Sequence, residues 1–489
     1  MSAHPAIDAT VLHTLLREDL RTFIERCFYE LHPGVPFHAN WSLDLIASRL
    51  MDVAAGRTRR LIITLPPRSL KSISVSIAFT AWVLGRDPTR RLVCASYGQD
   101  LATALAQETR RILQSHWYQT VFPGTRLTAR RPNVDDLHTS RGGGRLATSV
   151  GGALTGRGGD ILIIDDPTKP DEALSDAQRE TANAWFQHTL RSRLNDPANG
   201  ALVIVMQRQH LDDLVGFVLE QGEAWEVVEL PAIATEEQSY SYRVLGYPVT
   251  KTRAMGDVLD PVRYPRAVIE QVRQELGTFH FEAQYQQSPV PMGGALIKSA
   301  WLQRYAPGDL PETFDTVVQS WDTAQKATEL SDYSACTTWG IAGGKAYLRS
   351  VHREKHEYPA LKRAVQQQAR QWKPDNILIE DHASGTALVQ ELKREGLWQV
   401  EAVKPRGDKV MRVAAHAAMI ESGVALFPGD APWWVEYEAE LTRFPKGKHD
   451  DQVDSTSQAL DWISTHLQEP AIITYYRREV ERMRSGRSD

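Results

Sequence analysis

The sequence has few cysteines and lacks long apolar runs. Its three cysteines, Cys27, Cys94 and Cys336, lie far apart along 489 residues, so they form no metal-binding spacing and no disulfide framework. This scarcity predicts a reducing compartment. No apolar stretch is long enough to span a membrane, and the first residues, MSAHPAIDAT, lack the charged and apolar regions of a signal peptide. We therefore expect a cytosolic protein with no membrane association.

An excess of one charge sign is also missing. The formal net charge is −5, so no global basic field indicates a nucleic-acid partner, and any DNA-binding surface must be local. There is no repeat of fixed period and no low-complexity tract. The length predicts two or three domains, each with enough residues for a core.

Glycine is absent from a strand–loop–helix pattern near the N-terminus, LIITLPPRSLKSISVS. Residues 61–65 form a buried apolar strand in this interpretation, a loop stiffened by two prolines follows, and Lys71 and Ser72 open a helix. This is the order of a P-loop, whose backbone N–H groups and helix N-terminus attract phosphate. Leu65 and Leu70 replace the usual glycines, so an ordinary strand–helix turn explains the stretch equally well. The predicted ATP-binding residues are Pro67, Arg68, Ser69, Leu70, Lys71 and Ser72.

Two later apolar strands strengthen the nucleotide interpretation. ILIIDDP, residues 161–167, reads as a Walker B strand in which Asp165 holds Mg²⁺ and Asp166 orients and deprotonates the attacking water, a role more often given to Glu. The alternative is a strand ending in a solvated Asp-Asp turn. ALVIVMQRQH, residues 201–210, places Gln207 and Arg208 where a γ-phosphate sensor would lie; a plain strand exit is the alternative. With Lys71 and Ser72, these strands predict a doubly wound, mainly parallel sheet.

An aromatic group precedes the first strand of this region. Phe37, His38 and Trp41 could pack on an adenine base, or they could be core aromatics at the start of a helix. Further along, residues 141–159 are rich in glycine, which by itself fits a flexible hairpin.

The second half of the chain delivers carboxylates from three separate elements. Residues 232–311 have weak periodicity and read as a linker or subdomain. Beyond them Asp322 ends one predicted strand, Glu380 ends another, and KGKHDDQVD opens a helix carrying Asp450, Asp451 and Asp454. This is the order of a ribonuclease H-like nuclease site, in which two Mg²⁺ or Mn²⁺ ions roughly 4 Å apart activate water and stabilise the leaving oxygen. Asp451 is the predicted catalytic member of the last group. Taken singly, each acid is more typical of a solvated surface position, but the placement of two at strand ends and the cluster of the third group favour the nuclease site.

Basic residues cluster between these acids. Lys404, Arg406, Lys409 and Arg412 form a local patch that predicts contacts with DNA phosphates, with a solvated helix face as the alternative. Residues 469–489 are basic near their end and are expected to be a flexible tail.

Taken in order, these motifs resemble the large terminase subunit of tailed bacteriophages and prophages. The similarity covers almost the whole chain. The matching segments are PPRSLKS, CASYGQDLA, GGALTGRGGDILIIDDP, IVMQRQH, FEAQYQQSPVPMGGALIK, SWDTA with DYS, ILIEDHASG and FPKGKHDDQVD. Irregular Walker A loops are common in that family, which accounts for the missing glycines.

The resemblance implies an ASCE-type P-loop ATPase in residues 1–231, a linker or subdomain in residues 232–311 and a ribonuclease H-like nuclease in residues 312–468. It also implies ATP with Mg²⁺ in the first domain, double-stranded DNA as substrate, and the procapsid portal protein and small terminase subunit as partners. The protein would act in the host bacterial cytoplasm, transiently at the portal, as a homo-oligomeric ring.

Motor rings of this kind commonly insert an arginine into the neighbouring subunit's γ-phosphate. Arg157 is the first candidate for this arginine finger, Arg145 is the second, and an ordinary surface arginine is the alternative.

Two other functions fit parts of the pattern. An inactive prophage remnant or scaffold would keep the fold without turnover, but the full set of acids and Lys71 argues against a decayed site. An ATP-driven DNA repair nuclease or helicase would show further helicase motifs after Gln207, and none is identifiable.

Overall fold

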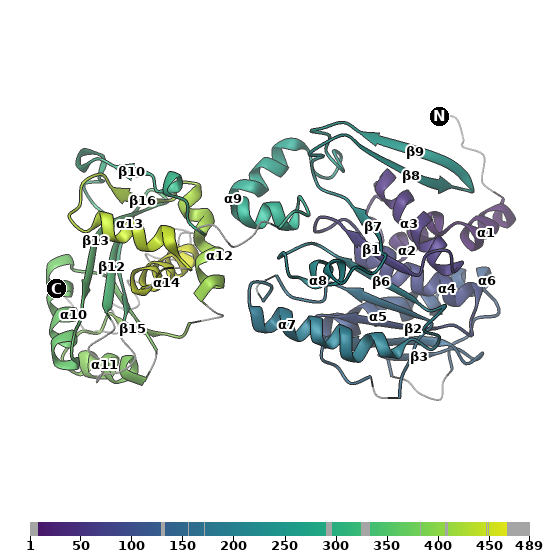
Figure 1. Ribbon diagram of the computed structural model, residues 1–489, viewed down its shortest axis with the longest axis horizontal. Coiled ribbons are helices and arrows are strands. Elements are labelled where there is room, and N and C mark those ends of the chain that lie inside the picture. The colour runs from purple at the N-terminus through teal and green to yellow at the C-terminus, as the bar shows by residue number, and fades with distance from the viewer. Residues whose placement is uncertain are drawn as a thin grey trace. The chain divides into compact units, whose positions relative to one another are not determined.

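The computed structural model describes residues 8–128, 133–154, 156–170, 172–289, 296–323, 333–381, 383–405, 409–445, 447 and 449–466. The chain divides into two compact units, Met1–Pro291 and Met292–Asp489, and each is described by itself (Figure 1). The boundary falls inside the segment 232–311 that the sequence marked as a linker or subdomain.

The first unit is built on a seven-stranded sheet with the order β3-β4-β2-β5-β6-β1-β7. All neighbouring strands run parallel except the β3–β4 pair at one edge. The predicted doubly wound, mainly parallel sheet is confirmed. The strands are β1 (Arg60–Thr64), β2 (Arg91–Ser96), β3 (Asp136–His138), β4 (Gly144–Ser149), β5 (Ile161–Asp165), β6 (Ala201–Met206) and β7 (Glu226–Glu229).

Helices cover both faces of this sheet, because its central strands are apolar on both sides. In β1, Leu61 and Ile63 belong to one buried cluster, whereas Ile62 belongs to the other. The helices on the first face are α1 (Ala9–Glu18), α2 (Leu20–Leu31), α3 (Trp41–Ala54), α4 (Thr80–Arg86), α5 (Gln99–Gln114) and α6 (His116–Val121). The opposite face is covered by α7 (Asp176–Trp185) and α8 (Leu214–Glu220) (Figure 1).

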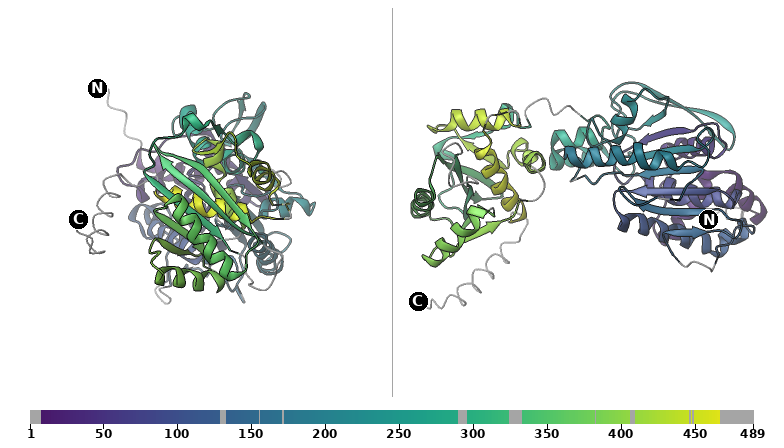
Figure 2. Two further views of the ribbon diagram at one scale, coloured as in Figure 1. Left: turned by 90° about the vertical axis from the view of Figure 1, so that its left-hand side faces the viewer. Right: turned by 60° about the horizontal axis from the view of Figure 1, so that its bottom comes forward.

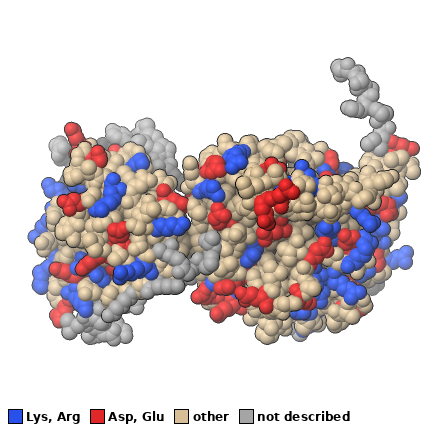
Figure 3. Space-filling model, turned by 45° about the horizontal axis from the view of Figure 1, so that its top comes forward, with Lys and Arg blue, Asp and Glu red and all other residues tan. Residues whose placement is uncertain are grey.

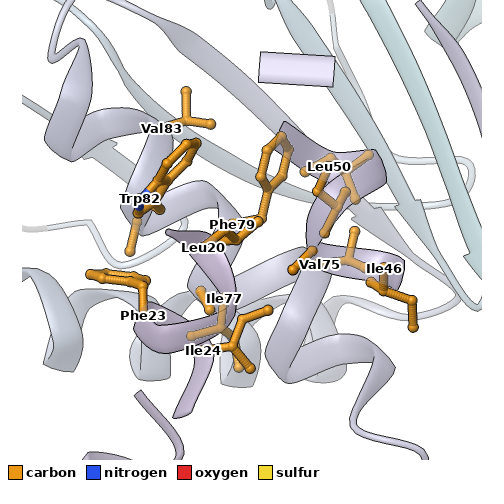
Figure 4. Close-up of a cluster of buried hydrophobic side chains, with 14 of the residues drawn as sticks. Leu20, Phe23, Ile24, Ile46, Leu50, Val75, Ile77, Phe79, Trp82 and Val83 are labelled. Atoms are coloured by element: carbon orange, nitrogen blue, oxygen red, sulfur yellow. The ribbon is translucent and has the colours of Figure 1, made fainter. Parts of the chain in front are cut away.

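The core on the first face fixes the helix that follows the P-loop. This helix starts with a π-helical segment, Ile73–Phe79, that runs directly into α4. Its side chains pack against α2 and α3, as the sticks in Figure 4 show. The labelled members of this cluster are Leu20, Phe23, Ile24, Ile46, Leu50, Val75, Ile77, Phe79, Trp82 and Val83.

The segment 232–289 is part of the first unit. It contains the hairpin β8 (Gln238–Val244) and β9 (Tyr247–Arg253) and the helix α9 (Arg266–Gln284), which is kinked at Gly277. The Ala232 N–H donates to the Tyr285 carbonyl over 2.7 Å, and Tyr242 and Leu259 are buried in the main core cluster. The aromatic group before β1 packs here too, since the Trp41 and Tyr240 ring centroids lie 5.2 Å apart. Trp41 is thus a packing residue in this structure.

The second unit has a mixed seven-stranded sheet with the order β10-β16-β13-β12-β11-β14-β15. Strand β12 is antiparallel to both of its neighbours, β11 and β13, while β11, β14 and β15 run parallel. This is the predicted ribonuclease H-like arrangement. The strands are β10 (Arg304–Tyr305), β11 (Thr316–Asp322), β12 (Ser334–Ala342), β13 (Lys345–Glu354), β14 (Asn376–Glu380), β15 (Val400–Val403) and β16 (Ala425–Pro428).

Helices again lie on both faces of this second sheet. On one side, α10 (Tyr358–Trp372) and α11 (Ala383–Arg394) pack over Trp321 and Cys336. On the other side, α14 (Asp451–His466) lies across β11 and β12, with α12 (Lys409–Glu421) and α13 (Trp434–Arg443) beside it (Figure 2). The predicted tail lies outside the described residues.

Candidate nucleotide and nuclease sites

In the first unit, the candidate nucleotide site lies at the carboxyl ends of three adjacent strands. Strand β6 lies between β1 and β5, and Thr64 pairs with Met206 while Val205 pairs with Asp165. The loop after β1, Gln207 after β6 and Asp166 after β5 therefore meet at one edge of the sheet, where ligands bind in open α/β folds.

The loop after β1 contains two left-handed residues without glycine. Arg68 has φ of 61° and Leu70 has φ of 59°. A left-handed backbone costs a non-glycine residue of order 1 kcal/mol or more, and such strain concentrates at ligand-binding loops. Leu70 thus adopts the backbone conformation for which glycine is the usual residue.

Lys71 is held at the centre of this edge. Its Nζ lies 2.8 Å from Asp166 Oδ2 and donates to Gln207 Oε1 over 2.8 Å. The side chain is buried, and Asp166 itself has a left-handed φ of 48° and receives the Gln207 N–H over 3.3 Å. The structure therefore brings together the lysine, the second aspartate and the glutamine that the sequence predicted for this site.

Asp165 lies deeper, on the end of β5. Burial, and then the neighbouring charge of Asp166, raise the pKa of its carboxyl to about 6, while the Ser76 hydroxyl and Lys71 oppose the shift. The Ser76 hydroxyl donates to Asp165 Oδ2 over 2.6 Å, and Oδ1 accepts no protein hydrogen bond. A buried carboxylate oxygen left open in this way suits a Mg²⁺ ligand.

Ser76 is a site residue that the sequence analysis missed. It follows Ser72 by four positions, which places both hydroxyls on one side of the helix. This spacing from Ser72 is the feature of the sequence that could have identified Ser76 as a site residue.

Gln207 and Arg208 were both candidates for sensing the γ-phosphate, and the structure separates them. Gln207 contacts Lys71, whereas the Arg208 guanidinium turns away to Asp213, with Nε 2.9 Å from Oδ2. The Arg208 N–H also donates to Gln287 Oε1 over 3.0 Å. The Arg208 side chain therefore forms a buried ion pair with Asp213.

The two arginine-finger candidates differ in exposure. The Arg157 side chain is 44% exposed and forms an ion pair with Asp136. Arg145 is 1% exposed on β4, so it cannot reach a neighbouring subunit from this position. The role of Arg157 stays a prediction.

In the second unit, the candidate nuclease site forms where β11 and β14 end side by side. Trp321 pairs with Ile379 on the parallel strands β11 and β14. Asp322 and Glu380 are the next residues of these strands, so they lie side by side. The start of α14 is fixed to the same place, because the Ser455 hydroxyl donates to the Ser320 carbonyl over 2.7 Å and accepts the Thr337 N–H over 2.9 Å.

The carboxylates at this place influence one another. Burial raises the pKa of Asp322 well above its usual range, and the charges of Asp454, Glu380 and Asp451 raise it further, in that order. The arrangement therefore joins the acids of three elements into one electrostatic group. Such a group fits hard divalent cations, which relieve the repulsion.

Two basic side chains of α12 lie against this acidic group. Lys409 Nζ is 2.8 Å from Asp450 and 2.7 Å from Asp454, and Arg412 is 2.8 Å from Asp454. These two residues of the predicted DNA-binding patch thus direct their charges at the carboxylates. Lys404 is exposed, and Arg406 lies outside the described residues.

The two aspartates at the start of α14 have different partners. Asp454 faces Lys409 and Asp322, whereas Asp451 lies 3.8 Å from Arg353. Burial and the nearby Glu440 charge raise the pKa of Asp451 to about 6. Among the neighbouring charges, that of Asp454 raises the pKa of Asp322 most, ahead of Glu380 and Asp451, and a catalytic role for Asp451 stays a prediction.

One chain thus combines a doubly wound α/β unit, with Lys71 after its first strand, and a mixed α/β unit with a group of carboxylates at its strand ends. Residues 319–461 match the sequence model of the terminase RNaseH-like domain. A crystal structure of the large terminase from a thermophilic bacteriophage matches with TM-score 0.52 and 11% identity, over 85% of this chain and 98% of that chain. The complex of that phage terminase with ATP-gamma-S matches with TM-score 0.50 and 10% identity, over 84% and 98%.

The large terminase of bacteriophage HK97 matches over 91% of this chain and 99% of that chain, with 12% identity and TM-score 0.37. No curated protein sequence gives a significant match. Residues 319–461 are therefore similar to the terminase RNaseH-like domain, and 85% of the chain shares the fold of the large terminase from the thermophilic phage. Within the part of the chain that the structure describes, no helix is both long and apolar enough to cross a membrane.

Proposed function

We propose that this chain is the large terminase subunit of a tailed bacteriophage or prophage. In this role it hydrolyses ATP to move double-stranded DNA into a procapsid and cuts concatemeric DNA with a metal-dependent nuclease. The observation that carries the proposal is the presence in one chain of both sites: Lys71 held by Asp166 and Gln207 in one unit, and Asp322 among three carboxylates in a terminase RNaseH-like domain.

In the ATPase, the residues position phosphate and water. Lys71 supplies a positive charge for the β/γ phosphates, and the loop residues 67–70 turn their backbone around them. Asp166 orients the attacking water and accepts its proton, while Gln207 links Lys71 to the end of β6. Asp165 and Ser72 would hold Mg²⁺, which supplies charge neutralisation of the phosphates when bound. The complex of the thermophilic-phage terminase with ATP-gamma-S supports nucleotide binding by this fold.

In the nuclease, Asp322, Glu380, Asp454 and either Asp450 or Asp451 would hold two Mg²⁺ or Mn²⁺ ions. Bound ions supply an activated water and stabilise the leaving oxygen of the cut strand. The chain itself orients the ligands: Ser455 fixes the start of α14 over β11, and Lys409 and Arg412 balance the negative charge. Exposed Lys404, with Arg406, would contact DNA phosphates.

Figure 3 shows basic and acidic side chains interspersed on the visible face of each unit, so a DNA contact must be local. The division into an ATPase (residues 1–231), a subdomain (residues 232–311), a nuclease (residues 312–468) and a tail (residues 469–489) belongs to the same proposal. So do the portal, small-subunit and ring partners, and the location in the host cytoplasm.

The test is a packaging reaction with the full chain, procapsids, small subunit and linear DNA. We expect ATP-dependent protection of the DNA from added DNase and stimulation of ATP hydrolysis by procapsids. A scaffold or inactive remnant would hydrolyse no ATP. A repair nuclease or helicase would hydrolyse ATP with DNA alone and protect none of it.

A further inference from the structure

The end of β13 carries a group of side chains that neither proposed site uses. His352 and Glu354 are two residues apart on this strand, and His356 follows in the loop before α10. One ligand atom from each of the three side chains lies within 4.8 Å of the other two. The His352 and His356 Nε2 atoms are 3.0 Å apart, and His356 Nε2 lies 3.5 Å from Glu354 Oε2.

These separations suit one transition-metal ion. Zn²⁺ binds imidazole nitrogen and carboxylate oxygen at ~2.0–2.2 Å in tetrahedral geometry, which places neighbouring ligand atoms about 3.3 Å apart. The two separations of 3.0 Å and 3.5 Å bracket that value. Without an ion, one imidazole must donate the proton that the two Nε2 atoms share; an ion would replace this proton once the rings turn so that both nitrogen lone pairs point at it.

The chemistry of the surroundings also suits a cation. Arg353 and Lys355 are neighbours of these side chains in sequence, but both direct their charges at the Tyr333 ring, at 4.0 Å and 5.0 Å from its centroid. The His356 side chain is 9% exposed, whereas that of Glu354 is 65% exposed. A buried imidazole and an open carboxylate leave an approach from solvent and room for a water ligand.

The group is separate from the nuclease carboxylates. Arg353 lies beside Asp451 and Glu440 on the side of the sheet covered by α13 and α14. His352 points to the other side, because alternate residues of a strand face opposite directions. There its ring centroid lies 5.7 Å from that of Trp321, which is buried in the cluster that α10 covers.

We propose that His352, Glu354 and His356 form a transition-metal site of the Zn²⁺ class. Two imidazoles and one carboxylate are the ligand set, and water completes the coordination. The ion ties the loop before α10 to the end of β13 and packs this end against Trp321, the residue before Asp322. Its role is structural, so it stabilises the second unit and leaves the Mg²⁺ or Mn²⁺ requirement of the carboxylates unchanged.

The experiment measures Zn²⁺ and Co²⁺ binding to the full chain carrying Asp322→Asn, which weakens the carboxylate site. Chelator competition gives the Zn²⁺ affinity, and the visible absorption of bound Co²⁺ reports imidazole ligands. We expect one Zn²⁺ ion per chain and a rise in the melting temperature of the second unit. His352→Gln and His356→Gln should each weaken Zn²⁺ binding by ~100-fold or more and abolish the Co²⁺ absorption, because a lost ligand costs at least as much as a lost supporting residue.

Two further variants keep the result interpretable. Glu354→Gln changes an exposed side chain with no risk to the core, and it should also weaken Zn²⁺ binding. His416→Gln is the matched control, since His416 pairs with Asp461 on other helices, and it should bind Zn²⁺ like the parent. Absence of bound Zn²⁺ in the parent, or equal binding in the His352, His356 and Glu354 variants, would overturn the proposal.

Discussion

Lys71 and Asp166, at the edge of the first sheet, carry the chemistry of the proposed ATPase. Lys71 donates to Gln207 and pairs with Asp166 over 2.8 Å each, so its position is set before a nucleotide arrives. A preorganised charge costs no rearrangement during the reaction, which is why its loss affects turnover more than folding.

We therefore expect Lys71→Ala and Asp166→Asn each to lower ATP turnover by ~10³-fold or more, the scale of losing a charged group at the γ-phosphate. Phosphate release by the purified chain measures this. Plasmid cutting by the same variants serves as the control and should persist, because the carboxylates belong to the other unit. Normal hydrolysis by Asp166→Asn would show that another residue positions the water.

At the nuclease site, the residue of interest is Lys409. Its ammonium group contacts Asp450 and Asp454, so it occupies carboxylate oxygens that a metal ion needs. We expect Lys409→Met to tighten Mn²⁺ binding by up to about fivefold, equivalent to ~1 kcal/mol for a half-exposed ion pair. Titration calorimetry of the full chain measures the affinity, with Lys404→Met as the matched control. Weaker Mn²⁺ binding by Lys409→Met would mean that Lys409 organises the ligands instead of competing with the metal.

Among the elements of the second unit, α14 is bonded to β11 through Ser455 and through Gln458, whose Nε2 donates to Ser320 Oγ over 2.9 Å. The Ser455 hydroxyl bridges the Ser320 carbonyl and the Thr337 N–H in a buried position. Removing it leaves both backbone groups without this partner, which costs ~1–3 kcal/mol for each buried group left unsatisfied.

Ser455→Ala should accordingly lower the unfolding free energy of the second unit by a few kcal/mol and reduce DNA cutting, while ATP hydrolysis stays unchanged. Urea unfolding followed by fluorescence measures the stability. Ser464 lies on an exposed turn of the same helix, and its hydroxyl donates only to the Asp461 carbonyl of that helix. Ser464→Ala should therefore change neither property. Equal effects of the two substitutions would refute an anchoring role for Ser455.

At the scale of the whole molecule, neutralising Asp322 should have opposed effects on stability and activity. Asp322→Asn should abolish cutting of plasmid DNA in Mg²⁺ or Mn²⁺ and leave ATP hydrolysis intact. The metal-free variant should melt at the same or a higher temperature than the parent at neutral pH, because it removes a buried charge from a group of like charges.

The difference in stability between Asp322→Asn and the parent should depend on pH. The folded-state pKa of Asp322 is raised, so the parent gains stability from this group in acid and loses it as the pH rises through the folded-state pKa. The advantage of Asp322→Asn should therefore grow with pH and vanish at low pH. Thermal melts in EDTA across this range measure it. A variant that is less stable than the parent at neutral pH would contradict the repulsion.

Assembly into a ring provides the remaining prediction. Arg157 is exposed enough to reach a neighbouring subunit after releasing Asp136. Mixing Arg157→Ala chains with Lys71→Ala chains should restore some ATP hydrolysis if Arg157 acts in trans, because some interfaces then combine an intact Lys71 with an intact Arg157. Phosphate release at varied mixing ratios measures this. Activity no higher than the sum of the separate variants would assign Arg157 a role within its own chain.

Apolar runs in the amino-acid sequence were enough to place the strands and the polar residues at their ends. Buried strands of an α/β fold are continuous apolar runs, and the polar residues that end them must lie at one edge of the sheet. Asp165, Asp322 and Glu380 could therefore be placed at the ends of their strands without the structure, and Asp166 and Lys71 could be placed just beyond theirs. The doubly wound sheet was predicted from the alternation of strands and helices, and the ribonuclease H-like domain from the order of the carboxylate-bearing elements and from the family resemblance.

Contacts between elements that are distant in the chain could not be predicted, and the packed structure set them. It turned Arg208 to Asp213, brought the Ser76 hydroxyl to Asp165, and placed the Lys409 ammonium group against Asp450 and Asp454. It also brought His356 back onto His352. Each outcome depends on helix rotation or loop path, which packing sets through many weak contacts. Local periodicity limits these choices to a face of a helix or the end of a strand, and the packed core selects among them.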